Sequence, residues 1–195
     1  GDYAGNALTT ADGCIAIGSG AMLVHTTGGQ NIAIGANAMK DTNVSSQQLG
    51  SLYNVFIGSE SGGGTWTGTT ASGYNVAVGS LTMAGAMAGS DYNTVVGYNA
   101  GNDITTADSC VAIGALALEK CTEGNFNIAV GYRAGDAITT GDDNVFIGTD
   151  TGGATQDVDK ATIIGHGAGA GVLDDGADGS VLIGASAGAA LTSGI

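Results

Sequence analysis

Residues 93–148 read NTVVGYNAGNDITTADSCVAIGALALEKCTEGNFNIAVGYRAGDAITTGDDNVFIG, and this stretch predicts the fold. Four times in it, at intervals of 17 residues, a small polar residue precedes three mainly apolar residues and a glycine. Short β-branched runs bounded by Gly and by Asn or Asp are typical of β-strands. A fixed period of this length indicates a repeat architecture.

The same motif extends over the whole chain of 195 residues. It occurs ten times, and each copy ends in a structural glycine: Gly18, Gly35, Gly58, Gly79, Gly97, Gly114, Gly131, Gly148, Gly165 and Gly184. Two repeats are lengthened, at residues 36–58 and 59–79. We therefore expect one solenoid domain over residues 1–195, with the extra residues of the two long coils on its surface.

Each repeat suffices for one coil whose strand stacks on the strand of the next coil. Stacked strands lie about 4.8 Å apart, so ten coils make a rod roughly 48 Å long. The sequence thus predicts an all-β fold, a parallel β-solenoid or β-roll of about ten 17-residue coils. The closing glycine is expected at a corner, where positive φ or close backbone approach is needed.

All three residues of most strands are apolar, including the middle ones such as Ala112 and Ala129. Because alternate strand residues face opposite sides, both faces of the sheet are expected to be buried. The coil interior covers one face, and we expect other copies of the chain to cover the face that carries the middle residues. This predicts a homotrimer.

Composition excludes several functions. The four Lys and Arg residues against 18 Asp and Glu give a net charge of −14, which argues against nucleic-acid binding. The uncharged run at 13–39 is interrupted by Gly and Asn residues, so membrane insertion is not expected. The only histidines, His25 and His166, lie eight repeats apart. We therefore expect no enzyme activity, no catalytic residue, no cofactor and no metal centre.

The three cysteines are interpreted as structural thiols. Cys14 and Cys110 replace the residue at the head of a strand and lie too far apart to bond within one chain. Cys121 falls where Ile104 and Ile138 stand in neighbouring coils, as a small core residue.

Three aromatic residues are candidates for ligand binding: Trp66 in the second long coil, and Tyr98 and Tyr132 directly after corner glycines. Ligand contacts are expected in the long coils, at 40–52 and 59–73, and their polar composition suits a neutral cell-surface saccharide. The alternative for Trp66 is that its ring folds back over the end of a coil.

Two further surface features are candidates for binding. One is a column of acidic residues from consecutive coils: Asp91, Asp108, Asp142 and Asp159. The column suggests a cation-binding ladder, and the simpler interpretation is that each Asp caps its own turn. Paired threonines such as Thr105-Thr106 and Thr139-Thr140 are reminiscent of ice-binding solenoids, but a corner role suits their broken column better.

The phrases NVFIGTDTGG, NTVVGYNAGNDITT and NIAVGYRAGDAITT resemble the repeats of bacteriophage tail-fibre proteins. They are also similar to the head repeats of trimeric autotransporter adhesins, which build a trimeric β-roll. The resemblance implies a structural or adhesive fibre segment used in host-surface attachment, located in a virion tail fibre or on a cell surface. Because the sequence starts at a repeat glycine and its last repeat stops just before the next strand head, further fibre segments are expected at both ends. A bacterial adhesin head or a self-assembling extracellular filament is the alternative, and an ice-binding or calcium-binding solenoid is a more distant one.

Overall fold

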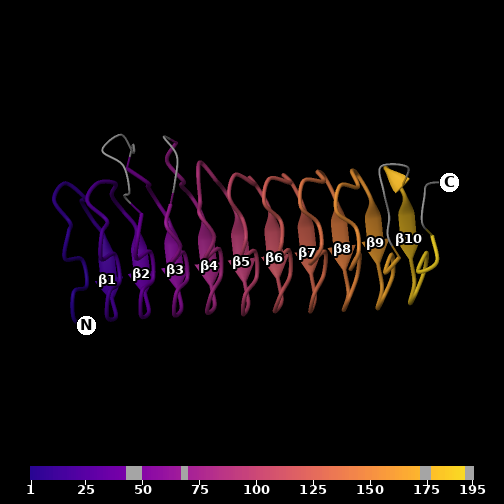
Figure 1. The fold of residues 1–195 in the computed structure, drawn as a ribbon, viewed down its shortest axis with the longest axis horizontal. Coiled ribbons are helices and arrows are strands. Elements are labelled where there is room, and N and C mark those ends of the chain that lie inside the picture. Colours follow the sequence, from indigo (N-terminus) through magenta and orange to yellow (C-terminus); the bar gives the residue numbers. More distant parts are fainter. Residues whose placement is uncertain (43–49, 67–69, 172–176, 192–195) are drawn as a thin grey trace.

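The computed structural model describes residues 1–42, 50–66, 70–171 and 177–191. Its ten strands, each of three residues, form one parallel sheet in chain order and are stacked into a straight rod (Figure 1). They are β1 (Ile15–Ile17), β2 (Ile32–Ile34), β3 (Val55–Ile57), β4 (Val76–Val78), β5 (Thr94–Val96), β6 (Val111–Ile113), β7 (Ile128–Val130), β8 (Val145–Ile147), β9 (Thr162–Ile164) and β10 (Val181–Ile183). The predicted parallel β-solenoid is confirmed.

The strand register follows the repeat. Ile113 of β6 pairs with Val96 on one side and Val130 on the other, so equivalent residues of consecutive coils stack. The long coils keep this register, since Ile57 pairs with both Ile34 and Val78. The lengthening of these two coils therefore leaves the register of the strands unchanged.

The closing glycine of each repeat is required by the stacking. From Gly18 to Gly184 this position has a positive φ of 124–144°. A Cβ atom on Gly35 would overlap the carbonyl oxygen of Gly58, and one on Gly58 would overlap that of Gly79. Any larger residue would force the coils apart, which explains why this column is glycine throughout.

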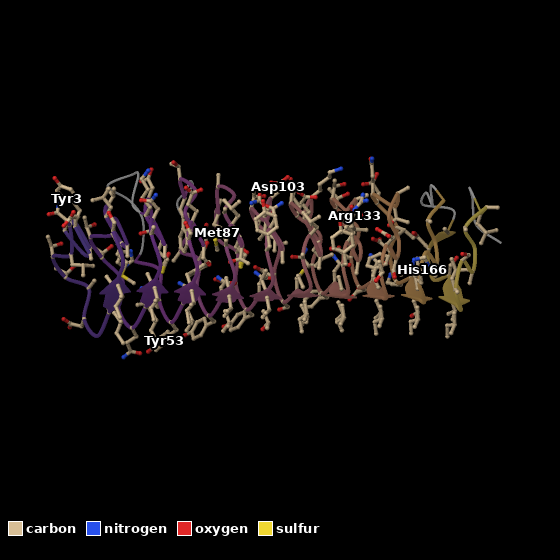
Figure 2. The ribbon with its side chains drawn as sticks, turned by 90° about the horizontal axis from the view of Figure 1, so that it is seen from below. Tyr3, Tyr53, Met87, Asp103, Arg133 and His166 are labelled. Carbon is tan, nitrogen blue, oxygen red and sulfur yellow. The ribbon has the colours of Figure 1, made fainter. Side chains whose placement is uncertain are left out.

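The two faces of the sheet are reversed relative to the sequence prediction. The middle residues, including Ala112 and Ala129, are fully buried inside the coil. The first and third residues of each strand, such as Ile15 and Ile17, point outward and are 45% and 55% exposed. Figure 2 shows these outward side chains on one side of the row of strands and the rest of each coil on the other. The prediction that the middle residues form the uncovered face is therefore wrong.

The middle residue of each strand shares the coil interior with the opposite arc, so that Phe56 and Phe146 lie against Gly62 and Gly152. Ala33, Ala77, Ala112 and Ala129 leave room for larger side chains from the opposite arc of each coil. That arc contributes buried residues that continue the core along the rod: Met22, Met39, Met83, Met87, Ile104, Leu118 and Ile138. The core is thus one continuous apolar column closed by β-strands on one side.

A buried asparagine ladder stands at the head of the strands. The side-chain oxygen of Asn75 accepts hydrogen bonds from the backbone N–H and the side-chain amide of Asn93, both 3.0 Å long. The side-chain oxygen of Asn54 accepts the same two hydrogen bonds from Asn75, and that of Asn31 accepts them from Asn54. These bonds satisfy polar groups that the stacking would otherwise bury without partners.

Candidate functional site

The outward sheet face is an apolar surface that follows all ten strands. Its two columns are formed by the first and third residues of the ten strands, and all of them are Ile, Val or Thr. Ten of these residues are exposed in the single chain: Ile15, Ile17, Val76, Thr94, Val96, Ile113, Ile128, Ile147, Val181 and Ile183. We call these two columns the outer face.

The dimensions of the outer face follow from its strands. Nine inter-strand steps of about 4.8 Å give a length of about 43 Å, and three residues per strand give a width of about 10 Å. The resulting area of about 430 Å² is about half of what each partner buries in a standard protein–protein interface. It falls in the range of the largest apolar patch on a typical monomeric protein, and patches of this size are often functional.

Aromatic residues border the outer face on the side where the strands begin. Tyr74 stacks on Tyr53 and on Tyr92, with ring centroids 5.0 Å apart in both pairs. Phe126 stands in the same column two coils beyond Tyr92, with Ser109 between them. Tyr92 and Phe126 are 60% and 57% exposed. Figure 2 places Tyr53 on the outward side of the sheet.

The predicted ligand residues Tyr98 and Tyr132 border the other side of the outer face. They follow Gly97 and Gly131 and are exposed, as expected for surface aromatics. Ala115 lies between them in the same column. The sixth coil, which contains β6, therefore carries small residues at both borders, between aromatic residues of the fifth and seventh coils. We call this arrangement the β6 trough.

Trp66, by contrast, does not lie on the surface. Its side chain is 1% exposed and packs edge-on against Phe56, with ring centroids 5.7 Å apart. Its indole N–H donates a hydrogen bond to the carbonyl oxygen of Gly62 at 3.0 Å. The alternative in which the ring folds back onto the coil is the one the structure adopts, and the ring face needed for stacking on a sugar is not available.

The long coils run side by side at their bases. Asp41 and Thr65 form a parallel bridge, and the hydroxyl of Thr65 donates to the Asp41 carboxylate at 2.9 Å. Residues 43–49 and 67–69, which make up much of the predicted ligand-binding segments 40–52 and 59–73, lie outside the described residues. The ligand prediction for these segments stays a prediction.

The Asp column forms a hydrogen-bonded ladder. The Asp108 carboxylate accepts the backbone N–H of Asp91 at 2.7 Å, and Asp159 accepts that of Asp142 at 2.7 Å. Asn125 stands between the two pairs and makes the same contact with Asp108. Each of these side chains therefore caps the preceding coil rather than its own turn.

The cation-binding role of this ladder stays a prediction. Within the described residues, no three His, Cys, Asp or Glu side chains gather closely enough to hold a metal ion. Burial raises the pKa of Asp91 above its ordinary value, and the neighbouring Asp108 carboxylate adds to this rise. The column is thus an acidic stripe that is held together by backbone contacts.

The cysteines fall into two arrangements. Cys110 and Cys121 are buried in the same coil, and both thiols donate to the carbonyl oxygen of Gly124, at 3.2 and 3.3 Å. Their mutual hydrogen bond lowers the pKa of Cys110 and, together with burial, raises that of Cys121. The sequence alone does not predict this pair, because the residues that face each other across a coil are known only once its cross-section is known.

Cys14 and His25 occupy the equivalent two positions in the first coil. The Cys14 thiol donates to the Gly28 carbonyl oxygen at 3.5 Å, and the His25 Nε2 lies 3.0 Å from the same oxygen. The hydroxyl of Thr42 lies 2.6 Å from Nδ1 of His25. Burial lowers the pKa of His25. His25 is thus a neutral core residue, whereas His166 is exposed far along the rod (Figure 2).

The chain was compared with known proteins, and no protein-family model, no curated protein and no solved structure matches it. Among the described residues there is also no helix of the length and apolarity that a membrane span requires.

Proposed function

We propose that the chain is a structural segment of an extracellular fibre that assembles as a homotrimer through its outer face. The observation that carries this proposal is the outer face itself, which presents Ile and Val along all ten strands and no charged side chain. A protein with a net charge of −14 keeps this surface free of charge although acidic residues are frequent elsewhere. Burial of such a surface by copies of the same chain is favoured by the hydrophobic effect.

A straight rod with a lengthwise apolar stripe suits a shaft. Three such rods that turn their outer faces toward a common axis bury the stripe along its whole length and leave the acidic arcs in water. Closed symmetry of this kind gives a discrete particle and not an open aggregate. The sequence resemblance to tail-fibre repeats supports a phage tail fibre that attaches to a host surface. A bacterial adhesin head or an extracellular filament subunit has the same physical requirements.

The mass of the particle tests the proposal. In multi-angle light scattering at micromolar concentration, we expect a mass three times that of the 18.8 kDa chain. A monodisperse monomer would contradict the proposal, and a dimer would contradict the trimeric arrangement. Chemical cross-linking before denaturing electrophoresis provides an independent count of the chains.

Adhesion to a neutral saccharide is a second candidate function, and the β6 trough favours it. Tyr98 and Tyr132 stand two coil spacings apart, about 10 Å, with only Ala115 between them. A pyranose ring inserted at this level would lie about 5 Å from each tyrosine ring, a separation that permits stacking. The same spacing separates Tyr92 from Phe126 over Ser109.

Binding to a neutral glycan array tests this second function. Tyr98→Ala and Tyr132→Ala are each expected to abolish binding, because one wall of the trough is lost. Tyr3→Ala is the matched control, since Tyr3 is 70% exposed in the first coil and lies far from β6. Binding that persists in both trough variants, or that is lost equally in Tyr3→Ala, would exclude the trough.

A further inference from the structure

The sixth coil differs from its neighbours in the chemistry of two facing positions. The fifth and seventh coils place an asparagine at the strand head and an isoleucine on the opposite arc, as in Asn127 and Ile138. The sixth coil places Cys110 and Cys121 there. Both substitutions occur in one coil, so the two thiols meet inside the core.

The two thiols converge on one point. Each donates to the carbonyl oxygen of Gly124, at 3.2 Å from Cys110 and 3.3 Å from Cys121. Both side chains are fully buried, and no other cysteine of the chain lies in this coil. Two sulfurs at 3.2 and 3.3 Å from one oxygen cannot be more than 6.5 Å apart, so the pair lies close enough for a bond to be tested.

We propose that Cys110 and Cys121 form a reversible disulfide that locks the sixth coil. The oxidant is a low-molecular-weight disulfide. The Cys110 thiolate attacks one sulfur of that disulfide, which forms a mixed disulfide and releases one thiolate. The sulfur of Cys121, after losing its proton, attacks the Cys110 sulfur, forms the intrachain bond and expels the second thiolate. Two protons pass to the two released thiolates, and the oxidant gains two electrons.

The electrostatics of the pair distinguish the two thiols in the closed coil. Their side-chain hydrogen bond lowers the pKa of Cys110, and the same bond together with burial raises that of Cys121. Because both sulfurs are buried, the oxidant reaches them only when the coil opens, as it does during folding, and this pKa difference does not apply there. The same intrachain bond forms if Cys121 makes the first attack and Cys110 the second.

The bond would tie the head of β6 to the opposite arc of the same coil. Cross-linking these positions restricts the unfolded chain and therefore stabilises the folded coil. The cross-link would also stabilise the floor of the β6 trough from inside, since Ser109 and Val111 flank Cys110 in the sequence. The inference does not depend on whether the rod is a trimer.

Refolding under defined redox conditions tests the proposal. The chain is unfolded with reductant and refolded in a mixture of oxidised and reduced glutathione, and free thiols are then alkylated. Peptide mapping is expected to give one linked peptide pair that contains Cys110 and Cys121. Cys14, which faces His25 and no second thiol, is expected to be alkylated or to carry a single glutathione. The urea midpoint of the oxidised protein is expected to exceed that of the reduced protein and to return on reduction.

Cys121→Ser is the matched control, because serine retains a donor for Gly124 and is close in size. This variant is expected to give no linked peptide and a urea midpoint that does not depend on redox conditions. Recovery of alkylated Cys110 and Cys121 from the oxidised refolding mixture would overturn the proposal. So would a linked chain that fails to regain the β-sheet signal in circular dichroism, or links to Cys14 in comparable yield.

Discussion

The side-chain oxygen of Asn54 accepts two hydrogen bonds from Asn75 in the next coil, one from its backbone N–H at 3.0 Å and one from its side-chain amide at 3.1 Å. Asn75 repeats this contact toward Asn93 and also donates to the carbonyl oxygen of Ser90. All of these atoms lie in the buried interior. The ladder therefore links consecutive coils independently of the strands.

Asn75→Ala is expected to destabilise the rod by about 2–4 kcal/mol, because it leaves the buried N–H of Asn93 and the carbonyl oxygen of Ser90 without partners. Asn144→Ala is the matched comparison, because it leaves the equivalent pair without partners, the N–H of Ala161 and the carbonyl oxygen of Val158. A loss of similar size is expected there, smaller only by the amide contact that Asn75 makes with Asn93. Urea unfolding measures both variants. Losses below about 1 kcal/mol in both would show that these buried contacts do not carry the energy.

The outer face predicts a contrast between two adjacent residues of β6. Ile113→Asp places a charge on the outer face and is expected to abolish assembly while the chain remains folded. Ala112→Asp places the same charge inside the coil, where it has no partner, and is expected to unfold the chain. Light scattering and circular dichroism distinguish the two outcomes.

Thr106→Asp provides the control for added charge, since Thr106 is exposed on the arc away from the strands. It is expected to change neither the assembly nor the circular dichroism spectrum. Assembly that survives Ile113→Asp would contradict the role of the outer face. Loss of assembly in Thr106→Asp would indicate a general effect of charge.

The fold was largely predictable because the repeat period fixes the register. The glycine column follows from the overlap that any Cβ would create at Gly35 or Gly58, and this constraint is visible in the sequence. Periodicity alone does not tell which strand residues point inward when all three are apolar. Side-chain volume does not tell it either: Ala33 and Ala112 are buried, but so are Phe56 and Phe146, which are larger than the outward Ile and Val residues.

The candidate site was less predictable because it depends on the cross-section of the coil. Cys110 and Cys121 are 11 positions apart, and only the folded coil shows that they face each other. Trp66 lies in a Gly-rich segment whose composition suggests exposure, yet its ring fills the core beside Phe56. Large aromatic residues bury more apolar area than any other side chain, and this gain outweighs the local polarity of the segment.

The acidic column predicts that neutralising one of its members stabilises the rod. The pKa of Asp91 is raised by burial and by Asp108, so the folded state binds the proton more readily than the unfolded state. The stability from this group is present at pH values below its ordinary pKa and is lost as the pH rises through the folded pKa. Asp91→Asn is therefore expected to raise stability at neutral pH by about 0.2–1 kcal/mol. The amide oxygen can still accept the N–H of Gly73, as Asn125 does for Asp108.

Asp103→Asn is the control for this variant, because Asp103 is exposed outside the column. The advantage of Asp91→Asn is expected to shrink in acid, where the wild-type carboxyl is protonated, and in high salt. An advantage that is constant from acid to neutral pH would exclude the electrostatic explanation.

Addition of EDTA is expected to leave the urea midpoint unchanged, since stacked strands and the asparagine ladder hold the rod together. A large drop in the midpoint would instead assign a cation to the Asp column.

His25 predicts a loss of stability in mild acid. Its neutral ring, with the proton on Nε2, donates to the Gly28 carbonyl oxygen and accepts from the Thr42 hydroxyl. Burial lowers its pKa below the ordinary value of 6.5, so the unfolded state takes up the proton first as the pH falls. The stabilisation is therefore complete above that value and declines below it, by at most about 1.4 kcal/mol per pH unit for one proton. Urea unfolding between about pH 5 and pH 8 measures this dependence of stability on pH. His25→Gln is expected to remove the part that comes from His25. The Asp91 carboxyl, whose pKa is raised, still contributes to the pH dependence with the opposite sign. A slope that is unchanged in His25→Gln would assign the pH dependence to another group.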